Sequence, residues 1–182
     1  RRGGDVIQEE SDAWIQKHRS LPFDKNGDWA ASGHAIQSLL NKLLAENYFN
    51  TSPPKSCGRD LFNLQWLEQH LQGTENPADV QATLLALTGH AISSSILQYC
   101  VTAQEVYLCG GGAHNQALLD YLKQALPNCV VLLTDQLGID ADWLEAIAFA
   151  WLAQQTLLGL SANLPEATGA RHPCILGAIH QA

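Results

Sequence analysis

The stretch Val106-Tyr107-Leu108-Cys109-Gly110-Gly111-Gly112-Ala113-His114-Asn115 decides the fold class of this chain. Its apolar beginning predicts a short strand, its glycines a turn, and Asn115 the N-cap of a following helix. Glycine loses the most backbone entropy on folding, so three in succession favour a turn whose backbone approaches a ligand closely. A simple strand-to-helix turn is the alternative, and one glycine usually suffices for it. We therefore predict a ligand site at Gly110, Gly111 and Gly112, where the helix N-terminus offers N–H groups to phosphate or ribose oxygens.

Downstream of the glycine triplet, the pattern of apolar residues predicts a helix, a second strand and another helix. The first helix has a leucine face and should end at Pro127, and the strand is Val130–Leu133. Asp140 is expected to cap a helix that runs through Leu158. Strand, helix, strand and helix in this order indicate a parallel βαβ unit with a right-handed crossover. The apolar tail at 174–179 suggests a final short strand or a packed end.

The chain upstream of the triplet is predicted to be helix and loop. Asp28 should cap one helix that continues to Leu44, and a loop rich in Pro, Ser and Gly follows at 50–59. A short helix is expected at 62–71, and Pro77 suits the first turn of a long one. The fold class is therefore α/β and rich in helix. We divide the chain into a mainly helical part, 1–102, and a βαβα nucleotide-binding part, 103–182.

Composition excludes several classes of function. The 182 residues carry a net charge of −8, and 46% of them are hydrophobic. Such a chain can bury a core, so global disorder is excluded. Nucleic acid and anionic membrane surfaces both require clustered Lys and Arg, so we expect neither as a partner. Two stretches without charged residues, 80–104 and 146–165, contain enough polar side chains to favour buried helices over membrane spans.

The five cysteines indicate a reducing compartment. They are odd in number, widely scattered, and form neither a CxxC pair nor a Cys/His spacing suited to zinc. We therefore expect a cytoplasmic protein with buried thiols, no disulfide framework and no metal held by the protein itself.

Several segments, in order along the chain, resemble the anhydro-N-acetylmuramic acid kinase family. The glycine stretch is similar to the adenosine motif of that family, and Asp12-Ala13-Trp14 matches its Asp-x-Trp. The further matching segments are Pro53-Pro54-Lys55-Ser56-Cys57-Gly58-Arg59-Asp60-Leu61-Phe62-Asn63, Asp79–Leu84, Glu145–Ala153, Asn163–Ala170 and Leu176–Ile179. The resemblance covers nearly the whole chain from Asp12 onward.

The resemblance implies the C-terminal lobe of an actin-like, ribonuclease-H-like ATPase fold, in the superfamily of actin and the hexokinases. It also implies a kinase that uses ATP and Mg²⁺ to phosphorylate 1,6-anhydro-N-acetylmuramic acid. Water opens the anhydro ring in the same reaction, which yields N-acetylmuramate 6-phosphate during cell-wall recycling. We expect this chain to be the C-terminal half of such a protein, with an N-terminal lobe as its missing partner and a homodimer as a plausible assembly.

The resemblance assigns candidate site residues one by one. Gly110, Gly111, Gly112 and Asn115 fall on the nucleotide motif. Glu145 falls on a motif that faces the interdomain cleft, where it would orient sugar or water; the alternative is a simple interaction with the helix dipole.

The loop at 50–59 supplies two further candidates. Lys55 and Arg59 would contact an anionic group, either the substrate carboxylate or a phosphate. The alternative for this pair is an ion pair with Asp60 or Glu68. We expect no catalytic role for His114.

Two parts of the kinase machinery are not identified in these residues. The phosphate-binding loop of the family has no counterpart here, and the catalytic Asp of the family falls on Gly3, so the base stays unidentified. Asp5 could take that role only with a shift in register. We therefore expect no kinase activity from this chain alone.

Two other functions stay open. A non-catalytic nucleotide-binding or interaction module of the same fold would also carry the glycine triplet. A dinucleotide-dependent oxidoreductase is the third alternative, because Asp135 follows the second strand where a ribose-binding acid would lie. Against it, Asn115 stands where the dinucleotide fingerprint requires its third glycine.

Overall fold

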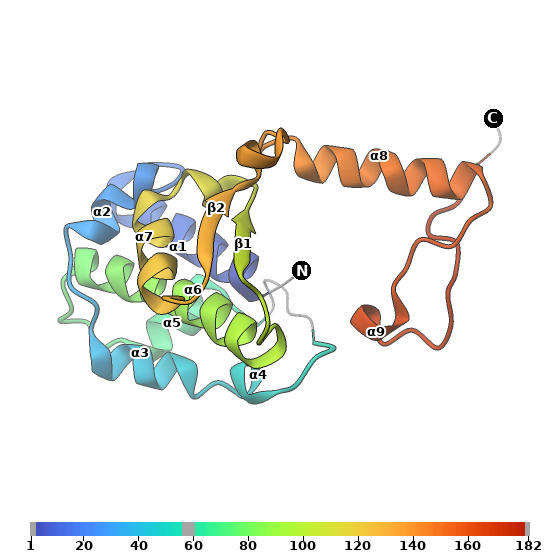
Figure 1. Cartoon of the computed structure of the whole chain (residues 1–182). Coiled ribbons are helices and arrows are strands. Elements are labelled where there is room, and N and C mark those ends of the chain that lie inside the picture. Colours follow the sequence, from blue (N-terminus) through green and yellow to red (C-terminus); the bar gives the residue numbers. More distant parts are fainter. Residues whose placement is uncertain (1–2, 56–60, 181–182) are drawn as a thin grey trace.

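The computed structural model describes residues 3–55 and 61–180, and side chains from Glu10 onward. It is mostly helical, with one two-stranded parallel sheet, and a C-terminal arm projects from a packed core (Figure 1). The helices are α1 (Gly3–Arg19), α2 (Asp28–Ala31), α3 (Gln37–Leu44), α4 (Asn47–Asn50), α5 (Leu64–His70), α6 (Pro77–Tyr99), α7 (Gln116–Ala125), α8 (Leu144–Leu157) and α9 (Pro165–Thr168). Short 3-10 turns are η1 (Lys25–Gly27), η2 (Gly111–His114) and η3 (Thr134–Leu137).

The long helix α6 forms the centre of the core. It begins as predicted, with Pro77 in its first turn and the Asn76 side chain accepting a hydrogen bond from the N–H of Ala78. α1, α2, α3 and α7 all pack against it. Val80, Leu84 and Leu87 are completely buried in this contact. The first half of α6 therefore lies at the centre of the apolar burial that holds the helices together.

α6 also passes a test of length and composition for a membrane span. It is the one such helix among the described residues, and 56% of its apolar window is buried inside the protein. The core helix of a soluble protein passes the same test, and the packing of four helices around α6 supports that interpretation.

The single helix predicted from Asp28 to Leu44 is wrong: the structure divides it into α2 and α3. Gly33 lies in the intervening turn, where a Cβ atom would come within 2.2 Å of the Ala78 carbonyl oxygen. Two backbones can approach so closely only at glycine. Asp28 is not the cap either; the buried Asp24 carboxylate accepts the N–H groups of Trp29 and Ala30, each at 2.9 Å.

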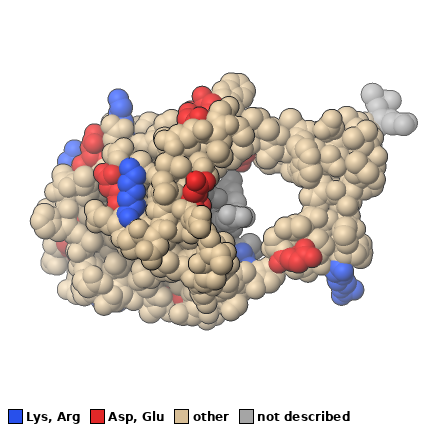
Figure 2. Space-filling model, in the orientation of Figure 1, with Lys and Arg blue, Asp and Glu red and all other residues tan. Residues whose placement is uncertain are grey.

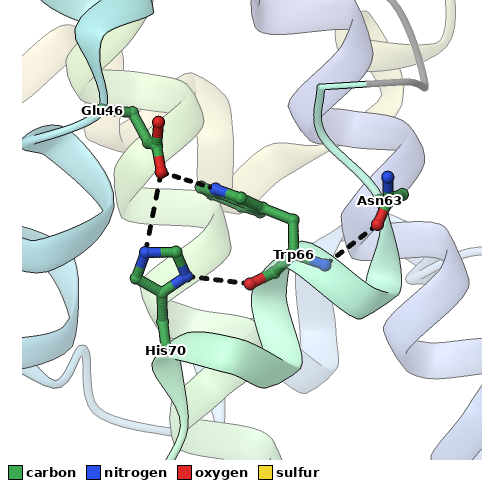
Figure 3. Close-up of polar contacts among 4 residues, drawn as sticks. All are labelled: Glu46, Asn63, Trp66 and His70. Carbon is green, nitrogen blue, oxygen red and sulfur yellow. Dashed lines mark hydrogen bonds and ion pairs between the residues drawn. The ribbon is translucent and has the colours of Figure 1, made fainter.

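A polar cluster joins α5 to the start of α4 (Figure 3). The Asn63 side chain caps α5 by accepting the N–H of Trp66 at 2.9 Å. The indole N–H of Trp66 donates to Glu46 Oε1 at 2.9 Å, and His70 Nδ1 donates to the Trp66 carbonyl at 2.8 Å. The ring of Trp66 packs edge-on against Phe62. The predicted helix at 62–71 is thus confirmed, two residues shorter at its start and one at its end.

The βαβ unit predicted from the glycine stretch is confirmed. β1 (Glu105–Leu108) and β2 (Val130–Leu133) pair in parallel, with Glu105 opposite Val130. α7 connects them, and its leucines pack with Val131 in a second apolar cluster. α7 ends at Ala125, two residues before Pro127, as that proline requires.

The C-terminal arm, residues 143–180, differs from the prediction. α8 projects from the core, and none of its residues is buried (Figure 1). Asp140 was predicted to cap this helix, but the N-cap is Trp143. The Asp140 carboxylate instead accepts the N–H of Asp142 at 2.8 Å. The tail was expected to form a short strand or a packed end, and both expectations are wrong. Among the described residues after β2 no strand forms, and Ile175 and Ile179 are exposed. A segment without charged residues tends to be buried, but its sequence does not show which surface it packs against.

The expectation of buried thiols is also wrong. Cys100 and Cys109 are exposed free thiols, and Cys129 and Cys174 are partly exposed. Cys129 Sγ donates to the Ala103 carbonyl at 3.1 Å, which ties the start of β2 to the loop before β1. Cys57 lies outside the described residues.

Candidate functional site

The glycine triplet forms a turn with open space beside it. Gly110 adopts φ 69° and ψ −166°, a backbone region essentially restricted to glycine. A Cβ atom on Gly110 or Gly111 would meet nothing within 4 Å, and one on Gly112 would make only ordinary contact with Leu118. The conformation explains Gly110, but neither packing nor a positive φ requires glycine at position 111. The lack of a side chain there leaves room for a ligand.

Asn115 lies behind this turn and is buried. Its Oδ1 accepts the N–H of Leu118 at 3.0 Å, so it caps α7 as predicted. A Cβ atom on Gly27 would come within 2.3 Å of the same oxygen, so the side chain is closely packed. Asn115 therefore orients the N-terminus of α7 beneath the triplet.

A cavity of about 1090 Å³ opens in front of the triplet. Its walls are the three glycines, β1, the second half of α6, the loop around Lys55 and the first turn of α8. Figure 2 shows a gap between the core and the projecting arm. Ligand pockets are commonly apolar concavities of this kind with a few polar groups. Lys55, the triplet and Glu145, distant in sequence, thus share one cavity.

Lys55 is held by backbone on one side of the cavity. Its ammonium donates to the Tyr48 carbonyl at 2.8 Å and lies 4.6 Å from the centre of the Tyr48 ring. The ammonium thus satisfies a backbone carbonyl near the end of α4, while the Lys55 side chain still lines the cavity. The pairing of Lys55 with Glu68 considered above is not formed, and Glu68 binds Lys17 instead. Arg59 and Asp60 lie outside the described residues.

Glu145 lies opposite, in the first turn of α8, and is exposed. A carboxylate in a first helical turn interacts favourably with the helix dipole, as the alternative interpretation requires. Its position on the cavity wall is equally compatible with contact to a bound polar ligand.

A histidine–aspartate pair next to the triplet was missed by the sequence analysis. His114 Nε2 donates to Asp142 Oδ1 at 2.7 Å. The hydrogen bond and the charge of Asp142 raise the pKa of His114 above its ordinary value; Asp135 and Asp140 add to this, and desolvation opposes it. Part of the signal was available, because the loops that follow two parallel strands lie at the same edge of the sheet.

Polar side chains on α6 were also missed. His90, Ser94 and Gln98 line the cavity at intervals of four residues. This spacing places them on one face of the helix, opposite the glycines. These polar side chains can exchange hydrogen bonds with a bound base or sugar.

Among the side chains that the structure describes, those of residues 10–55 and 61–180, no group of three or more His, Cys, Asp or Glu residues could hold a metal ion. Mg²⁺ commonly binds through one or two carboxylates and the phosphates of its nucleotide.

The family model described as anhydro-N-acetylmuramic acid kinase matches residues 9–182. Among curated relatives, proteins named anhydro-N-acetylmuramic acid kinase from Nitrosospira multiformis and Nitrosomonas europaea are 53% and 51% identical, each over 94% of this chain and 47% of the relative. One from Legionella pneumophila is 48% identical, over 93% of this chain and 46% of the relative. The chain thus spans about half the length of the curated relatives it matches.

Proposed function

The chain belongs to the anhydro-N-acetylmuramic acid kinase family, and from this premise we propose that it is the adenosine-binding, C-terminal half of an ATP-dependent carbohydrate kinase. The complete enzyme would transfer phosphate from ATP to 1,6-anhydro-N-acetylmuramic acid and open its anhydro ring, in the cytoplasm. In this proposal the fold is one lobe of an actin-like ATPase, and residues 103–182 form its nucleotide-binding part.

One observation carries the proposal: the open space beside Gly110 and Gly111 faces a cavity that Lys55 and Glu145 also line. Gly110, Gly111 and Gly112 would let the ribose and phosphates approach the backbone, above the α7 N-terminus that Asn115 caps. Lys55 would contribute positive charge towards the phosphates or the substrate carboxylate, in the role that Arg59 would share. Glu145 would orient the sugar or the attacking water.

The open space beside Gly110 and Gly111 is compatible with bound ATP. Mg²⁺ would be held mainly by the phosphates of the nucleotide. When bound, the ion neutralises charge on the transferred phosphate. We identify neither a phosphate loop nor a catalytic base among these residues, so we propose that the chain by itself binds ATP without turnover. An N-terminal lobe and, in the complete enzyme, a second copy are its proposed partners.

The test is a titration of this chain with ATP, followed by calorimetry, for the wild type and Gly111→Val. Valine would fill the space beside the turn, so we expect at least about tenfold weaker binding, or about 1.4 kcal/mol. Unchanged affinity in Gly111→Val would remove the triplet from the site. NAD serves as the competing ligand: stronger binding of NAD than of ATP would favour a dinucleotide site instead.

The kinase assignment is tested separately by adding the N-terminal half of a relative or by assaying the complete protein. Phosphorylation of the anhydro sugar would support the enzyme. ATP binding without turnover in the complete protein would instead favour the non-catalytic nucleotide-binding module.

A further inference from the structure

Two contacts join the glycine turn to the segment that leads into α8. The N–H of Gly110 donates to the Ala141 carbonyl at 2.8 Å, and His114 Nε2 donates to Asp142 Oδ1 at 2.7 Å. One contact involves the first glycine of the turn and the other the last residue of η2. They therefore span the turn from end to end.

The joined segment is the base from which the arm projects. Ala141 is buried, whereas Asp140 and Asp142 on either side of it are exposed. α8 begins at Leu144 and has no buried residue of its own. The direction of its first turn, including Glu145, thus depends on how residues 141 and 142 are held. The same contacts fix both walls of the cavity, the triplet and Glu145.

We propose that His114 is a positioning residue of the nucleotide site: through Asp142 it holds the glycine turn and the start of α8 in one relative position, and this tie weakens when His114 loses its proton. The description of the cavity as a nucleotide site rests on the proposed function above. The tie itself rests only on the contacts between the two loops.

The surroundings of His114 make the tie sensitive to pH. Three carboxylates act on the ring: Asp142 in direct contact, and Asp135 and Asp140 at longer range. They favour the imidazolium form, while partial desolvation opposes it. With a charged ring the contact is an ion pair. With a neutral ring it is a hydrogen bond to a carboxylate, which lacks the attraction between two opposite charges and is therefore weaker.

The first test measures the tie without any ligand. We compare the wild type with Asp142→Asn, and use Asp120→Asn as the control, because Asp120 is an exposed carboxylate on α7 that accepts a side-chain hydrogen bond from Gln116. At about pH 6, amide exchange at Gly110 should be about two- to fivefold faster in Asp142→Asn than in the control. The NMR titration of the His114 ring should move to lower pH in Asp142→Asn only. Equal exchange rates in the two variants would overturn the proposal.

The second test uses ATP and the pH profile of its affinity. The variant is His114→Gln. Its side-chain amide keeps a hydrogen-bond donor but does not titrate. The wild type should bind ATP about two- to fivefold more tightly than His114→Gln at about pH 6, and this ratio should approach one at about pH 8. A ratio that does not change with pH would overturn the positioning role. If the wild type does not bind ATP at all, the proposed function fails, and Gly110 exchange still decides the tie.

Discussion

The core helix α6 and the projecting helix α8 have a similar apolar composition, but α6 is largely buried and α8 is exposed. Both belong to long stretches without charged residues, and both carry apolar residues on more than one face. Val80, Leu84 and Leu87 of α6 are completely buried, whereas Phe149 and Leu157 of α8 are 64% and 74% exposed. Apolar composition therefore indicates how much a helix gains from burial, whereas the arrangement of its neighbours decides whether it is buried.

The residues that stabilise the fold and the residues of the proposed site lie in different regions. The buried residues of α6 hold the core together, but the proposed site lies at the boundary, where the triplet at the core edge faces Glu145 on the arm. Regions of lower local stability commonly carry the parts of a protein that bind and move. Changes in the two regions should therefore have different consequences.

The largest expected effect breaks the core directly. Leu84→Ala removes a completely buried side chain and leaves a cavity, so we expect a loss of about 2–5 kcal/mol in the free energy of unfolding. Leu157→Ala is the matched change in α8 and should cost less than about 0.5 kcal/mol, because its side chain is 74% exposed. Urea unfolding followed by circular dichroism measures both. Similar losses in the two variants would mean that α8 is packed in solution.

A smaller effect compares two aspartates that accept backbone hydrogen bonds. Asp24→Ala leaves the buried N–H groups of Trp29 and Ala30 without an acceptor, which should cost about 1–3 kcal/mol. Asp140→Ala removes a bond to the N–H of Asp142, where water can replace the carboxylate, so about 0.5 kcal/mol or less is expected. Urea unfolding followed by circular dichroism measures the loss of stability in both variants. An Asp140→Ala variant as unstable as Asp24→Ala would contradict the distinction between core and boundary.

The smallest effect is a dependence of stability on pH at the boundary. Because the pKa of His114 is raised in the folded protein, its ion pair with Asp142 stabilises fully below the unfolded pKa of about 6.5 and is lost as pH rises through the folded pKa. Both side chains are largely exposed, so the contribution should be no more than about 1 kcal/mol. Unfolding of the wild type and of His114→Gln between about pH 6 and pH 8 measures it. A difference between them that grows with pH would have the wrong sign.

Local patterns were sufficient where the structure depends on neighbours in sequence. The βαβ unit, the cap at Asn115 and the start of α6 at Pro77 follow from apolar periodicity and from the particular chemistry of Asn, Pro and Gly. The turn at Gly110 was likewise marked by its composition, since that backbone conformation excludes other residues.

Contacts between distant segments were the ones that local patterns missed. Gly33 breaks a predicted helix because it meets the backbone at Ala78, forty-five positions away. Lys55 contacts carbonyls of α4 rather than a carboxylate, and His114 contacts Asp142 across the edge of the sheet. Lys55 and Tyr48 are only seven positions apart, but the other two partners are distant in sequence, and no local pattern marks any of the three.

The amino-acid sequence was sufficient to identify the family, from motifs in order along the chain. It was also sufficient for the βαβ unit and the glycine turn, because both depend on residue types at short spacing. Only the tertiary structure decided that Lys55, the triplet and Glu145 surround one cavity and that α6 is buried while α8 is exposed. The physical reason is that backbone conformation is governed by neighbours along the chain, whereas burial and site geometry depend on which distant surfaces meet.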